Sequence, residues 1–589
     1  MKYISPKNWT DLANQQGLLF FAQILNESLF DYTLDTYKPK ALNIRLLCIE
    51  TITTIDDVKE GLIKKPNIEH VVDELLWSLN SDFLAKKILN NQLNEIIKEI
   101  NLKKNSLSEL RQIIILLYHY FDNHKYLNEI KSTLKILIPV GIEKEKIYSL
   151  TKLLITELIN YGYSPEYIYY ITNKFFFNYS TTITINNPDI FFNFFDFKKK
   201  NYSIIYKVNK LFKEFDDVAE VLGFKIQTTY KNNKLKGQEL NFINSKLKTQ
   251  YFVVFNIQAI DDKEARTESE HVILKLGNMF SFYHHKEAPE ISELAIVINK
   301  TDKYSILMDK PTKSIIKKSD VNPFIATQKV KNIFEDLNLL DKTIHRLTRV
   351  IDLHSIALSS KEIENKLLSL WTAVETLIPK DIECGKDRII QIIDAIIPFQ
   401  IYGYIKKLLD QAGNDFKHFD RRKSIQTIRS VVKNDETNKF EILAAFIMTK
   451  ENATIRETAK NSIQNNPLLQ YRLFSLNKTL NNSKSILKLL EDHKLKVEWQ
   501  IRRIYRVRNL IVHSGKKPSY VNLLVEHLHN YFDDMLNYII DKGISEKRIT
   551  TINEAILDCQ LKNKTMLEKI KLLKDSDIDL TNYKIVNDL

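Results

Sequence analysis

Apolar residues recur at helical spacing over the first part of the chain. Stretches such as HVVDELLWSLNSDFLAKKIL and IYSLTKLLITELINYG place them three or four residues apart, which is the spacing of one face of an α-helix. Gly162 predicts a helix end, and Ser164 with Pro165 predicts the N-cap and first turn of the next helix. Residues 1–177 are therefore predicted to form an all-helical N-terminal region.

Residues 178–322 carry shorter runs of aromatic and β-branched residues. The string FFFNYSTTITINNPDIFFNFFDF favours strands joined by a turn at Asn-Asn-Pro. Further strands are expected at 203–208, from Phe224, and at YFVVFNIQA, LAIVIN and YSILM, with a helix from about 262 to 280. This alternation predicts a small α/β module, with a split βαβ or ferredoxin-like arrangement as the candidate.

Helical spacing returns at residue 323. Long helices are predicted at 330–360, 360–379, 483–515 and 518–543, with a less regular insertion at about 380–482. Four such helices predict a four-helix bundle over residues 323–543. Residues 544–589 are predicted to be a helical, lysine-rich C-terminal tail, so the fold class is mainly α.

Composition agrees with a globular protein of several domains. Hydrophobic residues make up 44% of the 589 residues and charged residues 27%, enough to bury large cores. No apolar run approaches the roughly 20 residues of a membrane helix, and the start lacks a signal-peptide core. Cys48, Cys384 and Cys559 are too scattered for a disulfide framework or a thiolate metal cage. We therefore expect a cytoplasmic protein without membrane contact.

Basic residues outnumber acidic ones by 13, which favours polyanionic partners. Only 16 of the 86 basic residues are arginine, and the codon bias of an AT-rich genome explains the many lysines equally well. A cluster of arginine is informative in such a chain, because lysine supplies charge but not the planar guanidinium.

Four arginines lie within seven residues of the third long helix: Arg502, Arg503, Arg506 and Arg508. Helical geometry directs Arg508 into the apolar face of this helix. The polar stripe on the other side consists of Arg502, Arg506, Asn509 and His513. A guanidinium on an apolar face needs an anion. That anion is either a buried carboxylate, for which Glu375 is the candidate, or a phosphate.

The string RIYRVRNLIVHSG, with RVIDLHSIALSS and LLSLWTAVETLIP upstream, resembles the Apea-like branch of the HEPN superfamily. Arginine followed four to six residues later by histidine is a weak signal alone, since Arg349 with His354 also matches it. The extended signature adds the Arg-Asn pair, the Ser-Gly stop and a Leu-Trp-Thr-Ala-x-Glu helix about 130 positions earlier. The resemblance covers about residues 324–543.

The resemblance implies a metal-independent endoribonuclease that uses no cofactor, of the kind that acts as a toxin or abortive-infection effector in antiviral defence. Arg508 and His513 match the catalytic pair, and Asn509 matches the polar residue that follows the arginine. Glu375 matches the acidic position of the early helix and takes a supporting role. The other arginines of the cluster are expected to bind RNA: Arg502, Arg503 and Arg506.

These residue types suit RNA cleavage. The 2′-hydroxyl is the nucleophile, so the reaction needs a proton carrier, His513, and a cation for the phosphorane, Arg508. The two residues lie about 140° apart around one helix, so a homodimer is expected to complete the site. Expected partners are RNA, with tRNA as one candidate, and a phage-derived or nucleic-acid trigger.

Other interpretations stay open. The bundle could be a non-catalytic HEPN protein that binds nucleic acid, nucleotide or a partner, or the chain could be a compact RNA-guided effector. The histidine pairs at 284–285 and at 527 and 529 are weak metal candidates, the second pair being expected on a solvated helix face. The tripeptide 384–386 lacks the flanking residues of a phosphate-binding loop. No metal site is predicted.

Overall fold

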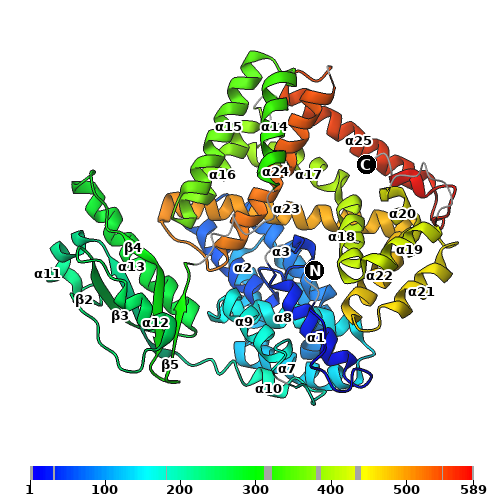
Figure 1. Cartoon of the computed structure of the whole chain (residues 1–589). Coiled ribbons are helices and arrows are strands. Elements are labelled where there is room, and N and C mark those ends of the chain that lie inside the picture. The colour runs from blue at the N-terminus through cyan, green and yellow to red at the C-terminus, as the bar shows by residue number, and fades with distance from the viewer. Residues whose placement is uncertain are drawn as a thin grey trace. The chain divides into compact units, whose positions relative to one another are not determined.

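The computed structural model describes residues 4–30, 33–180, 182–310, 321–379, 387–431, 439–546 and 548–586 (Figure 1). The chain divides into two compact units. The first contains residues 1–156, 179–188 and 314–589, and the second contains residues 157–178 and 189–313. The prediction of a mainly helical protein is confirmed. Cys384 and the tripeptide 384–386 lie outside the described residues.

The two compact units divide the chain differently from the predicted domains. The predicted boundaries at 177 and 322 lie near the ends of the second unit, but the helices on both sides of it belong together. The reason is tertiary: buried ion pairs join Arg503, late in the chain, to Glu50 and Glu74 in the N-terminal helices. No local pattern in the sequence reports such a contact.

The N-terminal helices are α1 (Gln16–Ser28), α2 (Ile44–Lys59), α3 (Pro66–Ser81), α4 (Phe83–Leu89), α5 (Leu93–Lys103), α6 (Leu107–Tyr120), α7 (Asn123–Val140) and α8 (Lys144–Tyr161). The helices after the second unit are α14 (Pro323–Asp336), α15 (Asp341–Ser359), α16 (Ile363–Leu377), α17 (Arg388–Tyr402), α18 (Tyr404–Phe419), α19 (Arg421–Val431), α20 (Lys439–Met448), α21 (Ala453–Ser462), α22 (Pro467–Leu480), α23 (Ser483–Ser514), α24 (Val521–Ser545) and α25 (Ile552–Leu572).

The four long helices predicted for residues 323–543 correspond to α15, α16, α23 and α24, which pack on one another. The predicted insertion contains α17 to α22. The first predicted helix is broken between α14 and α15, because the N–H groups of Asn338 and Leu340 donate to the carbonyls of Gly543 and Thr550 instead of continuing a helix. The predicted tail contains α25. Its apolar face packs into the hydrophobic core that α15, α16, α23 and α24 share.

Helix α23 is the central element of the first unit (Figure 1). It contacts α3 from the N-terminal helices as well as α16, α17, α22, α24 and α25. Its start is capped by the Asn482 side chain, which accepts a hydrogen bond from the N–H of Lys484 at 2.9 Å. It ends at Gly515, whose φ of 65° is the left-handed conformation that glycine tolerates best.

The second unit holds α9 (Pro165–Phe176), which begins at the predicted N-cap Ser164, and a five-stranded sheet. The strands are β1 (Lys200–Val208), β2 (Phe224–Gln227), β3 (Tyr251–Ala259), β4 (Ile291–Asn299) and β5 (Tyr304–Met308), in the order β2-β3-β1-β4-β5 with every neighbouring pair antiparallel. Helix α13 (Asp262–Tyr283) connects β3 to β4 across β1, which is a split βαβ arrangement.

The strands predicted in the aromatic string after α9 are not formed among the described residues. The segment instead contains the short helix α10 (Asp189–Phe192) and an isolated bridge at Ile183. The aromatic rings pack on one another instead of alternating across a sheet, with the centroids of Phe176 and Phe191 5.0 Å apart. Burial of these rings overrides their strand propensity.

No single described helix is long and apolar enough to cross a membrane, although α17 and α18 together, with a 40° bend between them, meet that test by length and composition.

Candidate functional site

Three of the four clustered arginines on α23 are already paired with carboxylates. Arg503 donates from Nε and Nη2 to the two carboxylate oxygens of Glu50, both at 2.9 Å, and from Nη2 to Glu74 at 2.5 Å. Arg506 donates to Glu50 at 2.6 Å. Arg502 pairs with Glu498 one turn earlier on its own helix, at 2.9 Å.

These ion pairs give no support to the prediction that Arg502, Arg503 and Arg506 bind RNA, least of all for Arg503 and Arg506. Both side chains are buried, with 3% and 9% of their surface exposed. Burial by itself would raise the pKa of Glu50, but the two guanidiniums outweigh it and lower that pKa to about 2. The carboxylate therefore stays ionised, and the three charges form a structural network between α2 and α23.

Arg508 differs from its neighbours. It is half-buried, and in the described part of the chain it has no carboxylate partner; its Nη1 donates to Oδ1 of Asn509 at 3.0 Å. The alternative of a buried ion pair with Glu375 is not formed. Arg508 and Asn509 therefore lie together as predicted, with the remaining donors of the guanidinium available to an anion.

Glu375 lies in a different environment, at the end of α16. Its backbone carbonyl accepts a hydrogen bond from Arg388 at 2.7 Å, and Arg388 also binds the carbonyls of Ile378 and Pro379. Burial lowers the pKa of Arg388, and the charge of the Glu375 carboxylate offsets only part of this effect. Glu375 forms no ion pair with Arg508, and its supporting role stays a prediction.

His513 is exposed in the last turn of α23. The helix continues without interruption to Ser514, so Arg508 and His513 keep the separation of about 140° that five helical residues impose. One chain therefore presents the guanidinium and the imidazole in different directions, and the structure does not bring the two predicted catalytic groups into one cleft of a single chain.

One group of side chains in the described residues could hold a metal ion: His354 on α15 with His529 and Asp533 on α24. The Nε2 atoms of the two imidazoles lie 2.9 Å apart, and Nδ1 of His529 lies 3.2 Å from the Asp533 carboxylate. His529 thus directs its two nitrogens to different partners, so the three groups form a chain of polar contacts. His529 is buried, which corrects the predicted solvated position.

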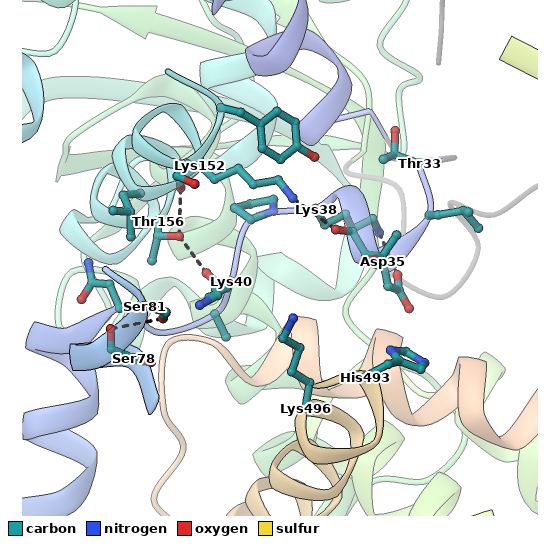
Figure 2. Close-up of a pocket in the computed structure, with 18 of the residues that line it drawn as sticks. Thr33, Asp35, Lys38, Lys40, Ser78, Ser81, Lys152, Thr156, His493 and Lys496 are labelled. Carbon is teal, nitrogen blue, oxygen red and sulfur yellow. Dashed lines mark hydrogen bonds and ion pairs between the residues drawn. The ribbon is translucent and has the colours of Figure 1, made fainter. Parts of the chain in front are cut away.

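The first unit contains a cavity of about 1330 Å³ that no pattern in the sequence predicts (Figure 2). Its walls come from the loop before α2, from the helices α3, α8, α18, α22 and α24, and from the middle of α23. Eight lysines line it, and three of them face one another across its inner part: Lys40, Lys152 and Lys496. These positions are far apart in the sequence and ordinary in a lysine-rich chain, so only the fold marks them as a group.

Comparison with models of known protein families, with curated proteins and with solved structures found no match.

Proposed function

We propose that the chain is a metal-independent endoribonuclease of HEPN type that acts in antiviral defence or growth arrest in the cytoplasm. The observation that carries the proposal is the state of Arg508. It is the one arginine of the cluster that has no carboxylate partner in the described structure, and it lies five residues before an exposed histidine on the same helix.

The arrangement of the surrounding helices supports the proposal. Helices α15, α16, α23 and α24 pack together with α17 to α22 inserted between the second and third, which is the organisation expected of an HEPN bundle with an insertion. In this setting α23 acts as a rigid support. Its apolar residues Ile501 and Ile504 are fully buried, so the helix end that carries Arg508 and His513 is held in place.

The chemistry follows from the two side chains. His513 takes a proton from the 2′-hydroxyl or gives one to the leaving 5′-oxygen, because imidazole exchanges protons near neutral pH. Arg508 binds the nonbridging oxygens of the phosphate as negative charge builds up. Asn509 holds the guanidinium through its side-chain oxygen. The products are a 2′,3′-cyclic phosphate and a 5′-hydroxyl.

The proposal includes a homodimer, because the uninterrupted helix keeps Arg508 and His513 on different sides of α23. Two copies of the helix end related by a two-fold axis would place the arginine of one chain near the histidine of the other. The substrate is RNA, with tRNA as one candidate, and a phage-derived or nucleic-acid signal is the proposed trigger.

End-group analysis of cellular RNA tests the reaction. Brief induction of the wild-type chain is expected to produce fragments with 2′,3′-cyclic phosphate and 5′-hydroxyl ends, whereas the soluble His513→Ala variant produces none. Purified wild-type protein is expected to cleave RNA equally well with and without EDTA. Cleavage by His513→Ala at the wild-type rate, or loss of wild-type cleavage in EDTA, would contradict this mechanism.

A dilution series tests the shared site. Specific activity is expected to fall as the protein concentration drops through the dimer dissociation constant, because each monomer alone has half of a site. Analytical ultracentrifugation at the same concentrations gives the oligomeric state. Full specific activity in a sample that sediments as a monomer would rule out a site composed from two chains.

A further inference from the structure

The cavity of the first unit is lined by eight lysines and one arginine against seven carboxylates, and three of the lysines lie together without an ion pair among the described residues. Figure 2 shows Lys496 reaching from α23 toward the wall that carries Lys40 and Lys152. None of the three ammonium groups forms an ion pair in the described structure. Nζ of Lys152 donates to the carbonyl of Thr36 at 3.2 Å. The ammonium groups of Lys40 and Lys496 lie over the ring of Trp77, at 4.4 and 5.1 Å from its centroid.

Three carboxylates whose charges act on Lys40 or Lys152 are occupied by other partners. Glu74 binds Arg503, and Glu27 binds Arg472. Asp82 accepts hydrogen bonds from the Tyr126 hydroxyl at 2.9 Å and from the N–H of Leu84 at 2.7 Å. The negative charge of these three carboxylates is thus used within the fold, and none of them forms an ion pair with Lys40, Lys152 or Lys496.

The electrostatic state of the lysines agrees with this geometry. Burial, and secondly the charge of Lys496, lower the pKa of Lys40 to about 8. Burial lowers the pKa of Lys152 to about 7, with smaller effects from the Glu27 carboxylate and from the charges of Arg472, Lys40 and Lys496. Lys40 and Lys496 nevertheless keep accessible surface. Protein surrounds these lysines while solvent still reaches them, as expected for side chains that line an open cavity. A bound anion would stabilise their charged forms.

Another part of the cavity wall is aromatic. The rings of Tyr148 and Tyr471 lie 5.4 Å apart. Phe474, one turn of α22 after Tyr471, leaves 57% of its surface exposed. An exposed aromatic face beside a group of cations offers stacking surface to a flat, apolar ring and charge to an attached anion.

We propose that this cavity binds a nucleoside polyphosphate, with its phosphates on Lys40, Lys152 and Lys496 and its base against the aromatic wall at Phe474. The volume exceeds the roughly 300 to 1,000 Å³ of ordinary small-molecule sites, so a nucleotide fits with ordered water. A small ligand agrees better than an RNA strand, because the exposed carboxylates of Glu143 and Glu145 also line the cavity and would repel a long polyanion. The site does not depend on RNA cleavage by Arg508 and His513.

Calorimetric titration of the full chain tests the proposal with ATP, GTP, CTP, UTP, inorganic triphosphate and adenosine as probes. At least one nucleoside triphosphate is expected to bind more tightly than triphosphate, and adenosine more weakly than either. Replacement of Lys40, Lys152 or Lys496 by methionine is expected to weaken nucleotide binding about tenfold or more each, because each removes a charge-assisted contact. Phe474→Ala is expected to weaken binding of the nucleotide but not of triphosphate.

Lys407→Met is the matched control. It removes a lysine from the same cavity, but this lysine is already paired with Asp534 at 2.6 Å, so nucleotide affinity is expected to change less than about twofold. Thermal unfolding without ligand shows that each variant is folded. The proposal is overturned if no triphosphate binds at millimolar concentration, or if the three lysine variants bind like the wild type. It is also overturned if triphosphate binds as tightly as the nucleotides, or if a single-stranded RNA binds through these lysines and nucleotides do not compete.

Discussion

Replacing Arg508 with alanine is expected to lower the rate of RNA cleavage by about 10² to 10⁴ while the protein stays folded. The loss follows from the guanidinium's proposed contact with the phosphorane, since removal of one such electrostatic contact costs about that much. Stability is expected to change little, because Arg508 is half-buried and bonds only to Asn509 among the described residues. Single-turnover cleavage of a labelled RNA, with thermal unfolding in parallel, measures both quantities.

Arg502 offers the matched control for this experiment. It lies on the same helix and pairs with Glu498 one turn away, so Arg502→Ala removes one positive charge without touching the proposed phosphate contact. Cleavage by this variant is expected to stay within a few-fold of the wild type. If the Arg502 and Arg508 variants lose activity equally, the effect is one of overall charge, and the catalytic role of Arg508 is wrong.

Glu50→Ala is expected to lower the free energy of unfolding of the first unit by about 3 to 5 kcal/mol. The substitution leaves the guanidiniums of Arg503 and Arg506 buried without their shared carboxylate, and a buried charge that loses its partner costs about this much. Urea unfolding followed by tryptophan fluorescence measures the loss. Trp77 on α3 and Trp499 on α23, with ring centroids 5.8 Å apart, lie at the same junction and report its opening.

Asp56 on the same helix provides the comparison. Its pair with Arg111 at 2.8 Å is exposed to solvent, so Asp56→Ala is expected to cost at most about 1 kcal/mol. Equal losses for the two variants would show that the buried network does not hold the N-terminal helices to α23.

The same network predicts an acid limit of stability. The pKa of Glu50 is about 2 in the folded chain, below its ordinary value of 4.5. Its contribution is therefore complete above pH 4.5 and is lost as the pH falls toward 2. A stability profile of Glu50→Gln is expected to be flatter than that of the wild type across this interval.

The sequence alone determined most of the helices, because caps and apolar spacing are local signals. Ser164 with Pro165 marks the start of α9, and Gly515 marks the end of α23, since a left-handed residue is needed there. The strands β1, β3, β4 and β5 follow from short runs of β-branched and aromatic residues. The strands predicted in the aromatic string that begins at the end of α9 are not formed among the described residues, because its rings are buried against one another and not in a sheet.

The role of each charged side chain was decided only by the tertiary structure. Arg503 and Arg508 have the same local chemistry, but Arg503 meets Glu50, 453 positions away, and Arg508 meets no carboxylate in the described structure. The convergence of Lys40, Lys152 and Lys496 is likewise a product of folding. Propensity acts over a few residues, whereas the partner of a charge depends on which helices pack together, and that information is absent from any short stretch of sequence.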